Sequence, residues 1–115
     1  MSKSRKMIMI DDELKKCLAE IVRFEKDNLK IKNNCVVSVL KAEASKDLHW
    51  CKVFISVLGC DKRELVNLLN ESEWLIRKFV AQRLNLRFTP KFVFFLDDGM
   101  EYSIQINDLL NKVKS

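Results

Sequence analysis

Five basic side chains stand close together in the second half of the chain, with no acidic residue between them. Guanidinium groups bind phosphate through two parallel hydrogen bonds and stack on nucleobases, whereas lysine acts as a point charge. A run of such residues is typical of a site for a polyanion such as RNA. The segment 74–91 contains Arg77, Lys78, Arg83, Arg87 and Lys91.

These cations also have structural alternatives. Arg77 or Arg83 could pair with Glu71 or Glu73 or cover apolar neighbours with its stem, and the whole set could be a solvated surface. Four further cations are candidates for phosphate contact, with ordinary surface charge as the alternative: Lys62, Arg63, Lys46 and Lys52.

Aromatic residues offer a second kind of RNA contact, because nucleobases stack on them. Trp74 could stack on an exposed base, but burial at a helix–helix junction is the commoner fate, and Trp50 is similarly ambiguous. Phe92, Phe94 and Phe95 resemble an aromatic RNA-binding sheet face, yet packing in the core explains them better.

Nothing in the chain indicates catalysis. Asp97, Asp98 and Glu101 are an acidic cluster at a turn, but neither a nucleophile nor a glycine-rich phosphate loop accompanies them. Four cysteines occur without a CxxC motif, and the one histidine cannot complete a usual zinc pattern. We therefore expect no enzyme, no metal, no cofactor and no small-molecule substrate, and we interpret the cysteines as reduced, mostly buried thiols.

Composition predicts one compact domain over residues 1–115. Half of the side chains are hydrophobic (48%), only two glycines and one proline occur, and the net charge is +5. No apolar run approaches the ~20 residues that span a bilayer. The apolar run at residues 7–10 is too short for a secretory leader. We expect a cytoplasmic monomer with residues 1–6 disordered.

Periodicity predicts the order helix, strand, strand, helix, helix, strand. An apolar stripe at helical spacing covers residues 14–22 of a helix over about 11–27, and β-branched residues alternate in strands 36–43 and 52–58. Two helices follow, around 65–69 and 76–86, then a strand at 92–96 and a C-terminal helix over 99–114. This order indicates an α+β, two-layer domain of the K-homology (KH) type II kind, with helices on one face of a three-stranded sheet.

Three segments together resemble the ribosome-binding factor A family. They read SKDLHWCKVFISVLG (45–59), IRKFVAQRLNLRFTPKFVFFLDD (76–98) and EYSIQINDLL (101–110). The family has an S-x-D-L hairpin followed by A-K-V-Y-V-S-V-L-G. It also has an I-R run leading to R-L-x-L-R-x-T-P, an aromatic strand, and D-D before a final I-x-x-L-L helix.

The family's Ala-x-Gly helix kink is altered in this chain. It falls on Ser72, Glu73 and Trp74, where serine can replace the small residue but tryptophan is a poor replacement for glycine. A bend that needs a positive φ would be strained at Trp74. The GxxG clamp of ordinary KH domains is absent, because Gly59 and Gly99 lie elsewhere.

The resemblance implies a factor that binds the free small ribosomal subunit, assists folding and processing of its rRNA, and is important in the cold. The alternative is a non-catalytic protein-interaction module with an incidental basic face. Salt separates the two hypotheses, since phosphate-driven binding weakens steeply as salt rises. The sequence does not reveal which rRNA segment is contacted or what triggers release.

Overall fold

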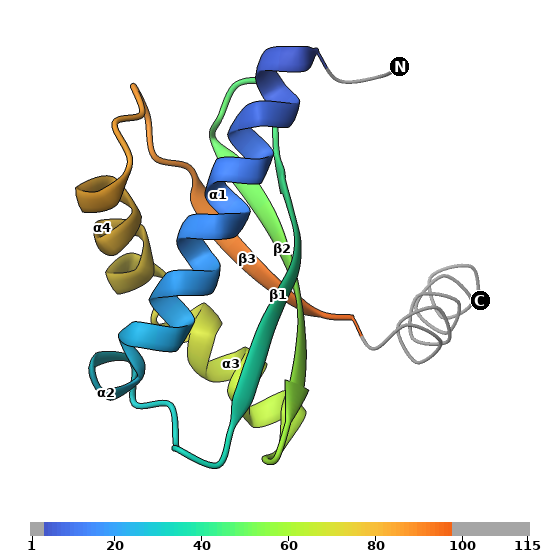
Figure 1. Cartoon of the computed structure of the whole chain (residues 1–115), viewed down its shortest axis with the longest axis vertical. Helices are drawn as coiled ribbons and strands as arrows, with labels where there is room; N and C mark the ends of the chain where they lie inside the picture. The colour runs from blue at the N-terminus through green and yellow to red at the C-terminus, as the bar shows by residue number, and fades with distance from the viewer. Residues whose placement is uncertain (1–3, 98–115) are drawn as a thin grey trace.

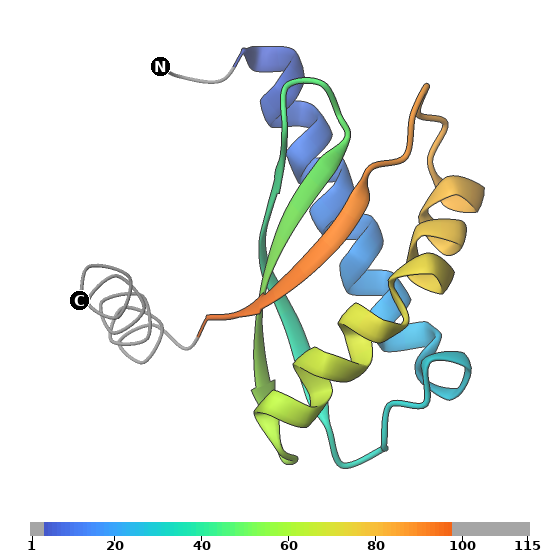
Figure 2. The same ribbon diagram turned by 180° about the vertical axis from the view of Figure 1, so that it is seen from behind.

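Three strands form one sheet, and the helices cover one of its faces (Figures 1 and 2). The computed structural model describes residues 4–97. Its elements are α1 (Arg5–Phe24), α2 (Lys26–Leu29), β1 (Val36–Ala44), β2 (Trp50–Leu58), α3 (Lys62–Glu71), α4 (Glu73–Arg83) and β3 (Lys91–Leu96). Apart from the short α2, which was not predicted, this is the predicted order and the predicted KH-like α+β architecture. The C-terminal helix expected over 99–114 lies outside the described residues.

Helix α1 begins earlier than predicted. The Ser4 side chain accepts a hydrogen bond from the Met7 amide (3.2 Å) and so caps the first turn. Serine is a preferred N-cap because it satisfies an amide that has no partner inside the helix. Arg5 and Lys6, which we expected to be disordered, therefore belong to the first turn of α1.

The sheet has the strand order β1-β2-β3. β1 and β2 pair antiparallel, with a bulge between Val39 and Lys41. β2 and β3 pair parallel, which places Trp50 opposite Lys91. Parallel neighbours need a long crossover connection, and α3 with α4 supplies it. The start of β3 is thereby brought beside the β1–β2 turn.

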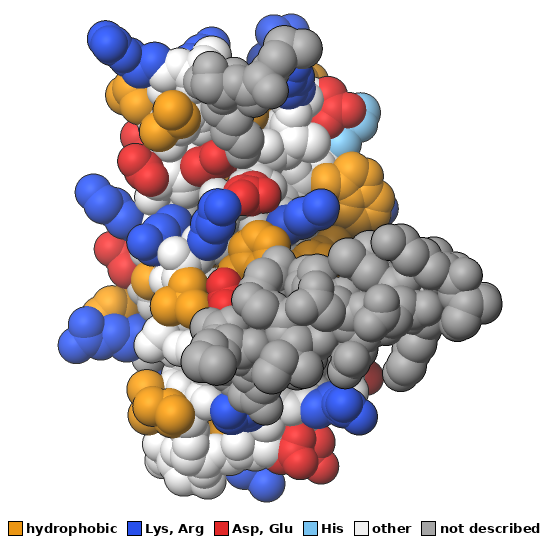
Figure 3. Space-filling model, turned by 90° about the vertical axis from the view of Figure 1, so that its right-hand side faces the viewer, with side chains coloured by type: hydrophobic (Ala, Val, Ile, Leu, Met, Phe, Trp, Pro, Cys, Tyr) orange, Lys and Arg blue, Asp and Glu red, His pale blue; other side chains and the backbone are white. Residues whose placement is uncertain are grey.

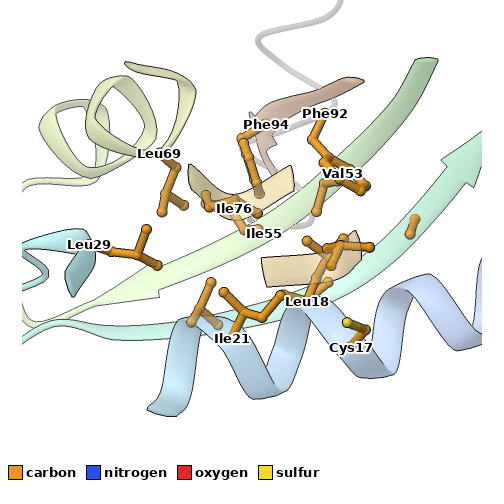
Figure 4. Packing of buried hydrophobic residues seen from close by; sticks show 14 of the residues in the cluster. Cys17, Leu18, Ile21, Leu29, Val53, Ile55, Leu69, Ile76, Phe92 and Phe94 are labelled. Atoms are coloured by element: carbon orange, nitrogen blue, oxygen red, sulfur yellow. The ribbon is translucent and has the colours of Figure 1, made fainter. Parts of the chain in front are cut away.

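The core lies between the sheet and the helices (Figure 4). Leu18 and Ile21 of α1 face Val53 and Ile55 of β2, and α3, α4 and β3 complete the packing. Burying apolar area at about 25 cal/mol per Å² makes this layer the main source of stability. Two of the three predicted core phenylalanines belong to it: Phe92 and Phe94.

Phe95 departs from the prediction, since it lies on the opposite face of the sheet, called the open face below because no helix within residues 4–97 covers it. Its ring stacks on Phe54 with centroids 5.6 Å apart, and 39% of the residue is exposed. Side chains alternate between the two faces of a strand, so Phe95 cannot share the buried face with Phe94. Figure 3 shows the open face, where hydrophobic side chains lie among basic and acidic ones.

The interpretation of all four cysteines as reduced thiols is wrong for two of them. Cys35, before β1, is joined to Cys60, after β2, by a disulfide, while Cys17 and Cys51 are free and buried. Burial raises the pKa of the Cys17 thiol. Residues 30–35 and 59–61, which the disulfide links, are called the disulfide end below.

Gly59 also shapes the disulfide end. Its φ is +87°, and a Cβ there would overlap the Asn34 carbonyl oxygen. The Asn34 side-chain amide donates to the Gly59 carbonyl (2.7 Å). Only glycine combines this backbone conformation with such a close approach, so the turn after β2 depends on it.

The junction between α3 and α4 needs no positive φ. Ser72 ends α3 at φ −95°, ψ 13°, and its amide donates to the Leu68 carbonyl (2.9 Å). Among the described non-glycine residues, only Lys30 and Leu48 have positive φ. The strain expected at Trp74 is therefore absent. The expected burial of Trp74 is wrong as well, because the residue is 62% exposed.

Candidate nucleic-acid interface

A polar network holds the turn between β1 and β2. The Ser45 hydroxyl (2.6 Å) and the His49 amide (3.0 Å) both donate to Asp47 Oδ1. The first of these hydrogen bonds, and then the second, hold the pKa of the Asp47 carboxyl below its usual value. Ser45 Oγ also accepts from the Trp50 amide (3.1 Å). Asp47 therefore forms the turn, and the turn fixes where β2 begins.

The start of β3 lies against this turn. The Lys91 amide donates to the His49 carbonyl (3.0 Å). Lys91 Nζ lies over the Trp50 ring, 5.8 Å from its centroid, and both side chains are exposed. A predicted phosphate-binding cation and an aromatic ring thus form one unit, which a cation–π attraction stabilises.

The loop between α4 and β3 supplies a second unit of the same kind. The Arg87 guanidinium lies over the Phe88 ring, 5.6 Å from its centroid. Phe88 lines an open hollow of about 320 Å³ together with Trp50 and Lys91. Residues 45–50 and 87–91, which border this hollow, are called the hairpin end below. Figures 1 and 2 show it at the opposite end of the sheet from the disulfide end.

Arg77 reaches the same hollow from α4, but an acid partly neutralises it. Its Nε lies 3.5 Å from Glu73 Oε2, and the same oxygen accepts a hydrogen bond from the Phe92 amide (3.0 Å). This is the Glu73 pairing that the sequence left open. Glu73 therefore ties α4 to β3 and fixes Arg77 at the edge of the hairpin end.

Arg83 contacts the N-terminal helices and does not line the hollow. Its guanidinium lies 3.4 Å from Glu20 Oε2 and 3.7 Å from Glu25 Oε1. These acids belong to α1 and the α1–α2 junction, so Arg83 links α4 to the N-terminal helices. Although no acidic residue lies between the five cations in the sequence, the fold places carboxylates beside Arg77 and Arg83.

The remaining candidate cations are divided among different parts of the molecule. Lys78 is exposed on α4, and Lys46 is exposed in the β1–β2 turn at the hairpin end. Lys62 and Arg63 begin α3, beside the disulfide end. Lys52 lies on the open sheet face, close to Phe54 and Asp97. The predicted cations consequently do not form one surface.

Phe88 is the residue that sequence reasoning missed. Its position within Arg-Phe-Thr-Pro-Lys is a usable signal, because an aromatic residue between cations in a proline-containing loop has little reason to join the core. Trp50, left ambiguous by the sequence, is exposed beside it. The sequence therefore indicated the cations of the hairpin end, left Trp50 undecided and did not indicate Phe88.

Other chemistry is not assembled in the part of the chain that the structure describes. No three His, Cys, Asp or Glu side chains within residues 4–97 are placed to hold a metal ion. Over the same residues, no helix combines the length and apolar character needed to cross a membrane. Exposed cations beside exposed aromatic rings are the chemistry that the hairpin end offers.

The whole chain can now be compared with known proteins. Residues 6–110 match the family model of ribosome-binding factor A. The chain belongs to the ribosome-binding factor A family. A ribosome-binding factor A of Clostridium novyi is 37% identical over 107 residues, covering 91% of this chain and 87% of that protein. One of Lachnospira eligens is 38% identical over 112 residues, covering 96% and 85%.

Solved structures of ribosome-binding factor A have the same fold. The crystal structure of the Thermus thermophilus protein superposes with a TM-score of 0.65 at 21% identity, covering 78% of this chain and 94% of that chain. A homology model of the Thermus thermophilus factor, fitted into a cryo-EM map of a complex with the 30S subunit, gives 0.61 at 20% identity, covering 74% and 88%.

Proposed function

We propose that this chain is a cytoplasmic, monomeric ribosome-assembly factor that binds the free small ribosomal subunit and assists maturation and processing of its rRNA. In this proposal it acts without catalysis, by stabilising one rRNA conformation and then leaving. It would matter most in the cold, when misfolded rRNA escapes slowly. Family membership and the 30S complex of the Thermus thermophilus factor support the choice of partner.

The hairpin end is the proposed contact surface. Arg87 and Lys91 are exposed there, Lys46 lies in the adjoining turn, and Arg77 borders the same hollow. Contacts to phosphate position a protein on RNA without reading its sequence, which suits a factor that recognises folded rRNA. The observation that carries the proposal is this cluster of cations around a hollow whose lining residues include no carboxylate.

The other predicted cations receive different roles. Arg83 is assigned to linking α4 with α1, because two carboxylates already hold its guanidinium. Lys78 remains a neighbouring contact on α4. Lys62 and Arg63 lie near the opposite end of the sheet (Figure 1), so the proposed contact does not include them.

Charge reversal at the two ends tests the proposal. Arg87→Glu/Lys91→Glu is compared with Lys62→Glu/Arg63→Glu, which changes the net charge equally. In co-sedimentation with free small subunits at several salt concentrations, the hairpin-end variant should bind at least tenfold more weakly and with a shallower salt dependence. The control should bind like the unmodified chain. Equal binding by both folded variants contradicts the proposed surface.

The alternative, a protein-interaction module, is favoured by the stacked Phe54 and Phe95 on the open sheet face. Exposed apolar side chains of this kind are common at protein interfaces. Binding through them should change little between low and high salt. Co-sedimentation that persists unchanged at high salt, and is lost in Phe95→Ser, would favour this second function.

A further inference from the structure

Two large aromatic side chains are exposed at the hairpin end and line the same hollow. Trp50 is 54% exposed and Phe88 is 57% exposed. Trp50 begins β2, whereas Phe88 belongs to the loop before β3, so the fold brings them to the same hollow from separate elements. Each ring leaves apolar area in water that burial would have stabilised, which indicates a role other than packing.

A cation holds each of these rings. Lys91 Nζ lies 5.8 Å from the Trp50 centroid, and Arg87 Cζ lies 5.6 Å from the Phe88 centroid. Such contacts attract each cation to the face of its ring, and a prearranged pair loses less entropy when a ligand binds. Each pair therefore presents an aromatic surface and a positive charge together.

The hollow between them suits a single nucleotide. Its volume of about 320 Å³ falls at the lower end of small-ligand pockets, roughly 300–1,000 Å³. The lining residues are Leu48, His49, Trp50, Arg77, Phe88, Thr89 and Lys91. They combine aromatic and aliphatic surface with two permanent cations, and the two nearby carboxylates, Glu73 beside Arg77 and Asp47 beside His49, are not among the lining residues.

We propose that this hollow binds one unpaired nucleotide of RNA. The base stacks on Trp50 or Phe88, and the neighbouring phosphates contact Arg77, Arg87 or Lys91. An acidic peptide would use the cations but not the ring faces, whereas every nucleobase has a face that stacks. The inference rests on the proposed function and adds to it that the contacted RNA is locally single-stranded at this point.

Tryptophan fluorescence provides a direct test. The chain has two tryptophans, so Trp50 is the probe of the hollow and Trp74 is its matched control. Trp74 is similarly exposed, but it lies on α4 outside the hollow. Two full-length variants are prepared, Trp74→Phe and Trp50→Phe, each with one tryptophan left. Adding a single-stranded RNA heptamer should quench the emission of Trp50 and leave that of Trp74 nearly unchanged. Equal quenching of both, or quenching of neither, overturns the nucleotide site.

Binding experiments separate stacking from phosphate contact. One probe is a heptamer backbone with a single central adenine and abasic positions elsewhere, and the other is abasic throughout. The unmodified chain should bind the first probe on the order of tenfold more tightly. Trp50→Ala/Phe88→Ala should lose this discrimination while keeping the salt dependence, since it removes no phosphate contact. Discrimination that persists in this variant overturns the proposal.

Co-sedimentation of the unmodified chain with free small subunits is measured in parallel. Salt-sensitive co-sedimentation without base discrimination overturns the nucleotide site and leaves the proposed function standing. Failure to co-sediment overturns the proposed function itself.

Discussion

The two ends of the sheet each border a hollow, but they are built from different chemistry. The disulfide end has a hollow of about 240 Å³ in which Lys30 and Lys32 share the lining with Asp61 and Glu64, and no aromatic residue takes part. The hairpin end combines its cations with Trp50 and exposes them. Both ends carry positive charge, so charge alone does not identify a binding surface.

The two ends also differ in how they are held. Three interactions hold the disulfide end. They are the Cys35–Cys60 disulfide, the close approach of Gly59 to Asn34, and a hydrogen bond from Lys26 Nζ to the Cys35 carbonyl (2.9 Å). At the hairpin end, a small polar network around Asp47 fixes the turn and leaves large side chains in solvent. We infer that the first end serves stability and the second serves binding.

Replacing Gly59 should have the largest effect on stability. Gly59→Ala forces a Cβ onto the Asn34 carbonyl at a φ that alanine disfavours, and should lower the free energy of unfolding by about 4 kcal/mol. Leu58→Ala, at the exposed neighbouring position, should cost less than about 1 kcal/mol. Urea unfolding measures both, and similar losses in the two variants would remove the special role of this turn.

The disulfide should have the next largest effect. Cys35→Ser/Cys60→Ser opens a loop with a sequence separation of 25 residues, and should lower the free energy of unfolding by about 3 kcal/mol. Reductant should destabilise the unmodified chain and leave the variant unaffected. Because the disulfide lies at the opposite end of the sheet from the proposed contact surface, binding to small subunits should be the same with and without reductant. A binding loss on reduction would show that the two ends are not independent.

Substitutions of Glu73 test whether Arg77 contributes to binding at the hairpin end. Glu73→Ala removes the acceptor of the Phe92 amide and should cost about 1–2 kcal/mol of stability. Glu73→Gln keeps an acceptor oxygen but releases Arg77 from its ion pair, so it should preserve stability and bind small subunits more tightly. Thermal unfolding and co-sedimentation check the pair, and weaker binding by Glu73→Gln would exclude Arg77 from the interface.

The smallest effect concerns pH at the β1–β2 turn. Hydrogen bonds from Ser45 and then from His49 keep the pKa of Asp47 below its ordinary value of 3.8. The ionised carboxylate therefore stabilises the folded state fully above that value, and the contribution is lost as pH falls through the lowered pKa. The difference in unfolding free energy between the unmodified chain and Asp47→Asn should be constant near neutral pH and shrink in acid. A pH-independent difference would show that the charge does not hold the turn.

Local patterns in the sequence predicted most of the fold. The alternation in β2 and the apolar stripe of α1 located both elements, because burial on one face imposes the period. Residues 5–10 of α1 were missed, because they lie before the buried stripe that starts at Leu14. The disulfide was missed because cysteine spacing does not determine which thiols meet in space.

The candidate site was predictable only in part. Arg87 and Lys91 were found from their charge, but Glu20, one of the two acids that pair with Arg83, lies 63 positions away in the sequence. Such a pairing depends on how α1 packs against α4, which no local pattern encodes. The placement of Trp50 and Phe88 around one hollow likewise follows from the parallel pairing of β2 and β3, which the periodicity of either strand does not reveal.

Hydrogen exchange compares the two ends most directly. The chain is exchanged alone and bound to free small ribosomal subunits, and protection is followed by mass spectrometry in peptides that cover residues 45–50, 87–91, 30–35 and 59–61. Binding should slow exchange in the first two segments and leave the last two unchanged. Protection confined to residues 30–35 and 59–61 would contradict the assignment of the hairpin end as the RNA-binding surface.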